Sequence, residues 1–176
     1  MRAKCLGFAD AWWENLEASP TQEELPDLDF HESGRMDCII EDFLYLGDPE
    51  SATEESLFHA DIWRCVSLLS KFSFKHAPTH LTPDTHLMLE MQDSETQNLE
   101  VITRLTTPFL RKAHNEGEKV LVHCSAGISR SVAVVLAYLL EYSDMDLDDA
   151  YEYVQQRRPV ACPNRGFMQQ LKHIKG

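Results

Sequence analysis

The sequence predicts an α/β fold: a central, mostly parallel twisted sheet with helices on both of its faces. Short continuous apolar runs at residues 65–69 and 120–122 are typical of strands that are buried on both sides. Longer segments with helical periodicity lie after each of these runs, at residues 99–114 and 130–142. Strands that alternate with helices are the usual pattern of a parallel sheet covered by helices.

The first half of the chain begins with two short predicted strands. Residues 39–40 and 43–46 are apolar, and the second run ends at a glycine. A helix is predicted over residues 49–60, because a proline followed by acidic residues is typical of a helix opening. The strand at 65–69 follows, and the prolines and polar residues of 71–85 indicate a loop.

The second half of the chain is predicted to be mainly helical. Residues 86–91 form another candidate strand, and residues 99–114 form a one-faced helix that Pro108 interrupts locally. The short strand at 120–122 leads toward residues 130–142, which are apolar almost all round and therefore predict a central buried helix. Two further helices are expected near the C-terminus, at residues 147–157 and 165–174.

The composition is that of one globular domain without a membrane span. A length of 176 residues corresponds to one domain at about 150 residues per domain. The longest apolar run, residues 132–140, is far shorter than the roughly 18 residues that a span needs. The net charge of −13 disfavours binding to nucleic acid or to an anionic membrane. Asp10 and Glu14 come too early for a signal peptide, so the cytoplasm or the nucleus is the expected location.

Residues 1–35 are predicted to be an acidic N-terminal arm. They hold eight Asp or Glu residues against three Lys or Arg residues. One amphipathic helix docked on the body is favoured by four apolar residues at roughly helical spacing: Phe8, Trp12, Trp13 and Leu16. A segment that binds a partner or faces the substrate is the alternative.

The cysteines are spaced too far apart for a structural zinc site. They are Cys5, Cys38, Cys65, Cys124 and Cys162. No Cys-x-x-Cys pair is present, and an odd count without a secretion signal argues against a disulfide framework. No metal and no cofactor are therefore expected. Cys65 and Cys162 are expected to be core residues, with a redox partnership to Cys124 as the alternative.

One segment, residues 120–131 (VLVHCSAGISRS), combines a strand end, a tight loop and a helix start. The small residues at 125–127 allow backbone N–H groups to turn inward. The helix is expected to begin at about Ser129, so that its positive dipole end faces the same point. Such a site at the carboxyl end of a strand can hold a tetrahedral anion, and the guanidinium of Arg130 can bind two phosphate oxygens.

Cys124 lies at the mouth of this predicted anion site. A helix N-terminus and a nearby guanidinium lower the pKa of a thiol from about 8.5 toward about 4–6, so that it is ionised at neutral pH. A thiolate in line with a bound phosphate ester is a nucleophile for phosphoryl transfer. The alternative is that Cys124 is an inert core residue. The sequence favours the first interpretation, in which Cys124 and Arg130 act on one phosphorus atom.

The motif HCSAGISRS (123–131) resembles the His-Cys-x5-Arg-Ser signature of the protein tyrosine phosphatase superfamily. Four ordered blocks are similar to the dual specificity phosphatase family: IIEDFLYLGD (39–48), MQDSETQNL (91–99), VLVHCSAGISRSVAVVLAYLL (120–140) and RRPVACPNRGFMQQL (157–171). The resemblance covers residues 36–174 and implies a catalytic domain at 36–176. The sequence shows no N-terminal rhodanese-like domain, so the chain resembles an atypical, catalytic-domain-only member.

The resemblance implies roles for four catalytic residues. Cys124 would be the nucleophile that takes the phosphate as a thiophosphate, and Arg130 would bind the phosphate and stabilise the transition state. Ser131 would hydrogen-bond the Cys124 sulfur as it leaves. Asp93 would be the general acid, kept protonated by neighbouring carboxylates. Asp84 is the alternative, but it follows a proline in a turn-like stretch.

The resemblance also implies binding and supporting residues. The backbone N–H groups that would bind the phosphate oxygens belong to Ser125, Ala126, Gly127, Ile128, Ser129 and Arg130. Asn164 would brace this loop from behind, and His123 would position the cysteine through hydrogen bonds. Arg157 and Arg158 are expected to be solvated charges, with a place at the pocket rim as the alternative.

The function that follows is a metal-independent, cysteine-dependent phosphatase whose partner is a phosphoprotein substrate. The loop has no lysine between Cys124 and Arg130, which disfavours inositol phosphates, and dual specificity is implied by the resemblance alone. A phosphoprotein-binding module with weak activity is the main alternative. A phosphatase of RNA 5′ ends or glycans and a Cys–His protease are less favoured. The sequence predicts neither an oligomeric state nor an individual substrate.

Overall fold

The sheet of this computed structural model is mixed but mostly parallel, as the sequence predicts. The structure describes residues 34–70 and 78–174, so the predicted arm lies almost wholly outside the described residues. Five strands in that part form one sheet in the order β1-β2-β5-β3-β4. They are β1 (Asp37–Ile40), β2 (Leu44–Gly47), β3 (Arg64–Leu69), β4 (His86–Glu90) and β5 (Val120–Cys124). Only the β1–β2 pair among them is antiparallel.

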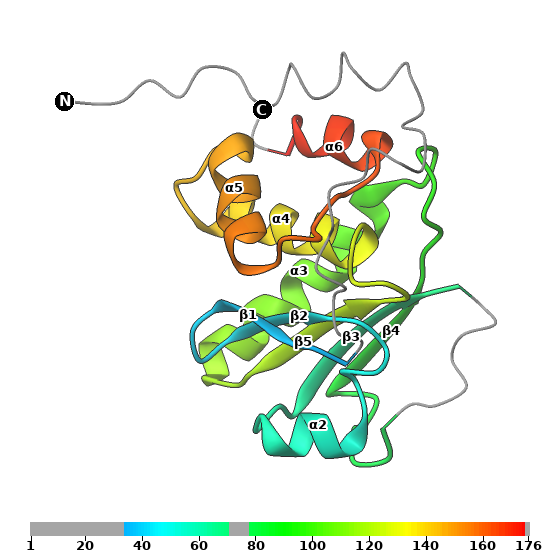
Figure 1. Cartoon of the computed structure of the whole chain (residues 1–176), viewed down its shortest axis with the longest axis vertical. Coiled ribbons are helices and arrows are strands. Elements are labelled where there is room, and N and C mark those ends of the chain that lie inside the picture. Colours follow the sequence, from blue (N-terminus) through cyan, green and yellow to red (C-terminus); the bar gives the residue numbers. More distant parts are fainter. Residues whose placement is uncertain (1–33, 71–77, 175–176) are drawn as a thin grey trace, which may run out of the picture. The chain divides into compact units, whose positions relative to one another are not determined.

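Helices cover both faces of the sheet, but unequally. They are α2 (Glu54–His59), α3 (Leu99–Glu116), α4 (Arg130–Tyr142), α5 (Leu147–Arg157) and α6 (Arg165–Leu171). Figure 1 shows the short helix α2 on one side of the sheet and the other four on the opposite side. The prediction of helices on both faces is therefore confirmed.

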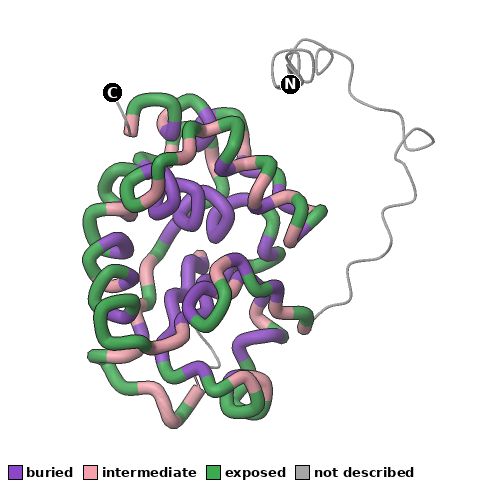
Figure 2. The backbone as a smooth tube through the Cα atoms, turned by 90° about the vertical axis from the view of Figure 1, so that its left-hand side faces the viewer, coloured by how far each residue is buried: buried purple, intermediate pink, exposed green. Residues whose placement is uncertain are grey.

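Helix α4 is the centre of the larger layer. It packs against α3, α5 and α6 and against the sheet. Every residue from Arg130 to Leu140 is buried, so the prediction of an all-round apolar central helix is confirmed. Figure 2 shows buried helix turns enclosed by exposed and half-buried segments. On the other face, α2 closes a smaller cluster that contains Leu57, Ile62 and Leu121.

The parallel strands bring their carboxyl ends to one edge of the sheet. In the register of the sheet, Cys124 at the end of β5 lies opposite Leu68 of β3, and Leu69 lies opposite Glu90 at the end of β4. The segments that follow these strands therefore meet at this edge, which is where open α/β sheets place their ligands.

Helix α2 is shorter than predicted. Helix α2 begins at Glu54 rather than near Pro49, because Asp48 and Ser51 form a hydrogen-bonded turn in which Ser51 N donates to Asp48 Oδ1 at 2.9 Å. Thr53 then caps the helix, since its side chain accepts from Ser56 N at 3.2 Å.

Helices α3 and α6 also differ from the prediction. Helix α3 runs through Pro108 to Glu116, so the predicted interruption is wrong. Pro108 is exposed, and its missing N–H affects the solvent side of the helix. Helix α6 ends at Leu171 rather than at residue 174, and turn hydrogen bonds continue from there.

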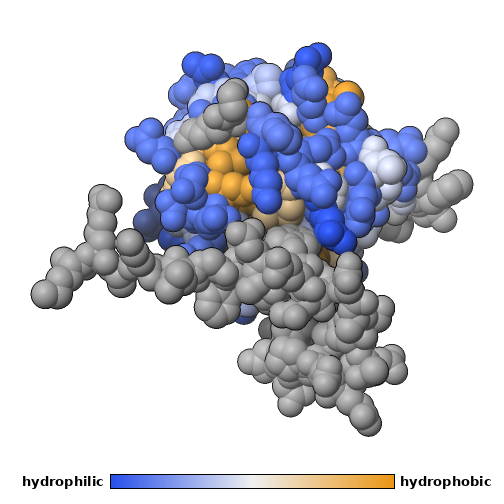
Figure 3. Space-filling model, turned by 90° about the horizontal axis from the view of Figure 1, so that it is seen from above, coloured by the Kyte–Doolittle hydropathy of each residue, from blue (hydrophilic) through white to orange (hydrophobic). Residues whose placement is uncertain are grey.

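Among the residues coloured in Figure 3, most on this face are hydrophilic, with smaller hydrophobic areas between them. Within the described residues, no helix has the length and apolar character that crossing a bilayer requires.

Candidate active site

The loop at residues 124–130 joins the end of β5 directly to the start of α4. Ser129 is the N-cap residue, so the helix begins at Arg130, close to the predicted position. Gly127 adopts a left-handed conformation with φ of +64°. A Cβ at this position would lie 2.5 Å from the carbonyl oxygen of Gly47 and would also collide with Arg158. Only glycine fits here, because it alone lacks the side-chain atom that would clash.

Cys124 is buried at the start of this loop and surrounded by hydrogen-bond donors. Its Sγ accepts from Gly127 N at 3.2 Å and lies 3.2 Å from Ser131 Oγ. Burial by itself would raise the pKa of the thiol. Hydrogen bonds from Ser131 and from the backbone of Ala126, together with the charge of Arg130, outweigh burial and lower that pKa. The surroundings of the sulfur therefore favour the thiolate form of Cys124.

The guanidinium of Arg130 is buried and held by two strand ends. Nη1 donates to Leu68 O at 3.3 Å, at the end of β3, and to Met91 O at 3.2 Å, just after β4. Nε has no hydrogen-bond partner among the described residues and lies 3.8 Å from Asp93 Oδ2. One edge of the guanidinium is thus anchored, which leaves Nε–H as a donor for an anion.

Asp93 lies against the loop, in the segment that follows β4. Its Oδ1 accepts from Ser129 Oγ at 2.6 Å and from Asn164 Nδ2 at 2.8 Å. Its side chain is 40% exposed, so a solvent-facing reactant can approach it. In the described part of the chain, the groups that contact this carboxyl group are a hydroxyl, an amide and a guanidinium.

Asn164 connects α6 to both the loop and Asp93. Its side chain caps α6 by accepting from Phe167 N at 3.0 Å, and its backbone N–H donates to Ser129 Oγ at 3.1 Å. The same side chain reaches Asp93 through Nδ2. The sequence suggested only contact with the loop, and the hydroxyl of Ser129 as the link was not predicted.

His123 points into a buried polar row across the sheet. Its Nε2 lies 2.6 Å from Ser67 Oγ, which in turn lies 2.7 Å from His86 Nε2. Burial lowers the pKa of His123 to about 4 and also lowers that of His86, so both rings are neutral at pH 7. Ser67, whose hydroxyl joins the two rings, carries no sequence signal that would have identified it.

Two expectations about single side chains are wrong. Cys162 is exposed rather than part of the core, because its segment runs along the surface of the loop, with Cys162 N donating to Ile128 O at 2.8 Å. Arg158 is fully buried rather than solvated, because its guanidinium binds a buried carboxylate and a backbone carbonyl. Arg157 is half-buried and lies 3.5 Å from the ring centre of Tyr153.

Cys65 is a buried core residue, as expected, and burial raises the pKa of its thiol to about 12. Within the described residues, no group of three or more His, Cys, Asp or Glu side chains is arranged to hold a metal ion.

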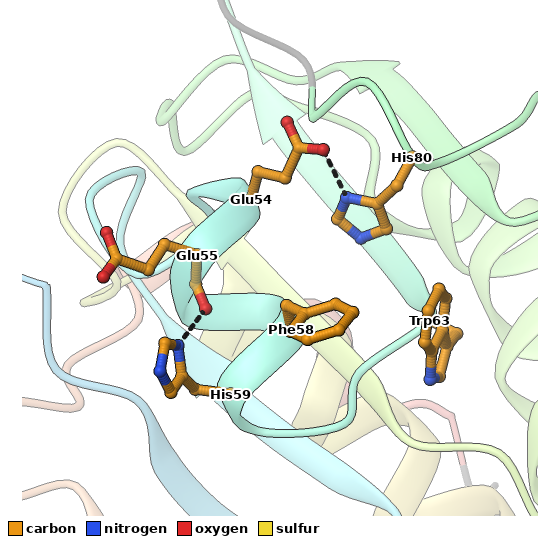
Figure 4. Close-up of a pocket in the computed structure, with 6 residues that line it drawn as sticks. All are labelled: Glu54, Glu55, Phe58, His59, Trp63 and His80. Carbon is orange, nitrogen blue, oxygen red and sulfur yellow. Dashed lines mark hydrogen bonds and ion pairs between the residues drawn. The ribbon is translucent and has the colours of Figure 1, made fainter.

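A separate pocket lies beside α2 (Figure 4). Phe58 and Trp63 pack edge to face across it with their ring centres 6.0 Å apart, and His80 lies against Trp63 at 5.8 Å. Glu54 Oε1 is 3.8 Å from His80 Nδ1. None of the residues around Cys124 lines this pocket, so it is not part of the candidate active site.

Comparison with known proteins identifies a family for this chain. The family model "Dual specificity phosphatase, catalytic domain" matches residues 44–175. Dual specificity protein phosphatase 1 of Arabidopsis thaliana is 33% identical over 138 residues, which are 78% of this chain and 68% of that protein. Dual specificity protein phosphatase 5 of Rattus norvegicus is 37% identical over 130 residues, 73% of this chain. The matched region spans only 33% of the rat protein.

Solved structures share the fold. The crystal structure of human DUSP28 has a TM-score of 0.70 and 30% identity, and the similarity covers 80% of this chain and 92% of that one. The human tyrosine phosphatase-like serine/threonine/tyrosine-interacting protein has a TM-score of 0.66 and 32% identity, with coverage of 78% and 93%. The family match runs from β2 through the 124–130 loop to α6, and the chain therefore belongs to the dual specificity phosphatases of the protein tyrosine phosphatase superfamily.

Proposed function

We propose that this chain hydrolyses the phosphate esters of tyrosine and of serine or threonine side chains in proteins, with Cys124 as the nucleophile. The observation that carries the proposal is the environment of the Cys124 sulfur. Two donors lie 3.2 Å from it and its pKa is lowered in spite of burial. A structural cysteine in an apolar core has the opposite shift, as Cys65 does.

In the first step, the phosphate of the substrate binds to the N–H groups of the 124–130 loop and to Arg130. The Cys124 thiolate attacks phosphorus, an S–P bond forms and the P–O bond to the substrate oxygen breaks. Asp93 gives its proton to that oxygen, so the leaving group departs as a neutral alcohol or phenol. The enzyme then carries the phosphate on Cys124.

In the second step, Asp93 accepts a proton from water as the water oxygen attacks phosphorus. The S–P bond breaks, inorganic phosphate leaves and the sulfur returns to the thiolate form. The Ser131 hydroxyl, 3.2 Å from Cys124 Sγ, stabilises the negative charge that returns to the sulfur. No other reactant is needed for the cycle to balance.

The position of Asp93 supports its role over that of Asp84. Asp93 follows the carboxyl end of β4, on the edge where β5 delivers Cys124. Asp84 precedes β4 and therefore lies toward the opposite edge of the parallel strands. A general acid must come within hydrogen-bond reach of the leaving oxygen, and this requirement favours Asp93 over Asp84.

The proposal is tested by turnover of phosphotyrosine and phosphothreonine peptides. We expect release of phosphate from both, inhibition by vanadate, insensitivity to a metal chelator and loss of nearly all turnover in Cys124→Ser. A serine hydroxyl has too high a pKa to ionise in this site, although Cys124→Ser should still bind substrate. Cys124→Ser activity within tenfold of the parent would contradict the cysteine mechanism.

A phosphoprotein-binding module is the second candidate, because the chain is also similar to a protein described as tyrosine phosphatase-like and interacting. That candidate predicts capture of phosphopeptides without turnover. Cys124, Arg130 and Asp93 lie together here, which favours catalysis. Binding of the same peptides by the parent with no release of phosphate would decide for the module.

A further inference from the structure

Arg158 joins three parts of the fold from a fully buried position at the end of α5. Its Nε donates to Gly127 O at 2.6 Å, and its Nη1 donates to Asp37 Oδ2 at 2.7 Å in β1. The side chain of Arg158 is 0% exposed and that of Asp37 is 4% exposed. One guanidinium therefore connects the β1 edge of the sheet to the loop that carries Cys124.

The contact with Gly127 sets the direction of the next N–H group. In a trans peptide, the carbonyl of one residue and the N–H of the next point in opposite directions. Because Arg158 holds the Gly127 carbonyl behind the loop, the N–H of Ile128 is directed to the other side. The N–H of Cys162 holds the Ile128 carbonyl at 2.8 Å in the same manner, which orients the N–H of Ser129.

Gly127 needs an anchor of this kind. With φ of +64° and no side chain, it places little restraint on the peptide planes beside it. If the plane after Gly127 rotated, its carbonyl oxygen would take the place of an N–H group and repel a bound phosphate. A carbonyl oxygen turned toward the site would also oppose the negative charge of the Cys124 thiolate.

Stability alone does not account for a buried ion pair here. Replacing such a pair with well-packed apolar residues is often neutral or stabilising, because removing two charges from water is costly. We infer that Arg158, paired with Asp37, is a positioning residue that keeps the N–H groups of the 124–130 loop directed at the phosphate. This inference rests on the proposed function, since it deepens the account of the same site.

The test compares three variants with the parent. Vanadate inhibition and Cys124 alkylation are measured under conditions in which each protein is fully folded, as its urea unfolding curve shows. The double variant Arg158→Met/Asp37→Leu replaces the buried pair with apolar side chains. It also removes the contact of Asp37 with Arg35, whose side chain is 61% exposed and stays solvated. Arg158→Lys keeps the charge but lacks the planar guanidinium. Arg157→Met is the matched control, because Arg157 contacts Tyr153 rather than the loop. The readouts are the urea midpoint, the inhibition constant for vanadate and the pH dependence of Cys124 alkylation.

We expect the double variant to keep a urea midpoint near that of the parent. Its vanadate binding should weaken roughly tenfold or more, the loss expected when one hydrogen bond to an anion is misdirected. The pH midpoint for Cys124 alkylation should rise in the same variant. Arg158→Lys should show a loss of the same kind, and Arg157→Met should match the parent in all three readouts.

Parental vanadate affinity and a parental alkylation profile in the folded double variant would overturn the inference. If the double variant does not fold, Arg158→Lys decides by the same two readouts. A parent protein that neither turns over phosphopeptides nor binds vanadate would instead contradict the proposed function, so the two failures are distinguishable.

Discussion

The sulfur of Cys124 is buried, which raises the pKa of the thiol, but it is also surrounded by hydrogen-bond donors. The donors and the charge of Arg130 have the larger effect, so the pKa is lowered. We therefore predict that its alkylation by iodoacetate has a pH midpoint below about 8.5, the value of an ordinary cysteine. Ser131→Ala should raise the midpoint, because it removes the hydroxyl 3.2 Å from the sulfur. Peptide mapping must separate Cys124 from the exposed Cys38 and Cys162. A midpoint at or above the ordinary value would contradict this account.

Nη1 of Arg130 donates to two backbone carbonyls, and Nε remains available to bind an anion. The single ammonium group of a lysine cannot make both sets of contacts. Arg130→Lys should therefore lower kcat/KM by about 10²–10³-fold, the usual effect of losing one donor to a transition-state oxygen. Arg104→Lys is the control, because Arg104 is exposed and pairs with Glu100 on α3. Comparable rates for Arg130→Lys and the control would rule out a role for the Nε–H group of Arg130 in binding the phosphate.

The acid assignment can be tested by paired substitutions. Asp93→Asn keeps the shape of the side chain but cannot donate a proton, so kcat should fall about 10²–10⁴-fold with phosphotyrosine substrates. The loss should be smaller for a fluorinated phenol, which leaves without a proton. Asp84→Asn should leave the rate unchanged, because Asp84 lies before β4. The reverse pattern would transfer the role to Asp84 without affecting the role of Cys124.

At the scale of elements, the N-terminus of α6 and the N-terminus of α4 hold Asp93 between them. Asn164 caps α6 through Oδ1 and reaches Asp93 through Nδ2. Asn164→Ser should keep the cap, and therefore the free energy of unfolding to within about 1 kcal/mol, but should lower kcat because serine is too short to reach Asp93. Asn164→Ala should lower both.

Urea unfolding and steady-state kinetics on the same preparations separate the two effects of Asn164. If Asn164→Ser retains the parental kcat, the contact with Asp93 has no catalytic consequence and the asparagine only caps the helix.

At the scale of the whole molecule, the row of His86, Ser67 and His123 makes stability depend on pH. The unfolded chain protonates His123 near pH 6.5, whereas burial keeps the folded ring neutral down to about pH 4. The unfolded state thus binds more protons between these values, and this group lowers the free energy of unfolding as pH falls, by about 1.4 kcal/mol per pH unit. His86 acts in the same direction.

This linkage can be measured as the difference in urea unfolding between pH 7 and pH 5. His123→Gln keeps a polar atom near the position of Nε2 but does not titrate. The variant should therefore lose less stability than the parent over this interval. Equal losses in both proteins would mean that His123 is already protonated in the folded state or does not contribute to the linkage.

The sequence alone determined the features that depend on neighbouring residues. The buried strand before Cys124, the small residues of the loop and the apolar helix after Ser129 lie within a short stretch, so their periodicity and spacing are sufficient to predict them. The mostly parallel sheet followed from the alternation of elements. The late start of α2 was missed because the turn between Asp48 and Ser51 depends on side-chain hydrogen bonds that periodicity does not report.

Only the tertiary structure decided which distant side chains support the loop. Arg158 and Asp37 are 121 residues apart, and Asn164 and Asp93 are 71 residues apart. An arginine in a polar stretch has the same local pattern whether it is solvated or buried, and its partner is set by where α5 ends relative to β1. The burial of Arg158, the exposure of Cys162 and the link from Ser129 to Asp93 therefore follow from packing between elements, which a local pattern in one chain does not encode.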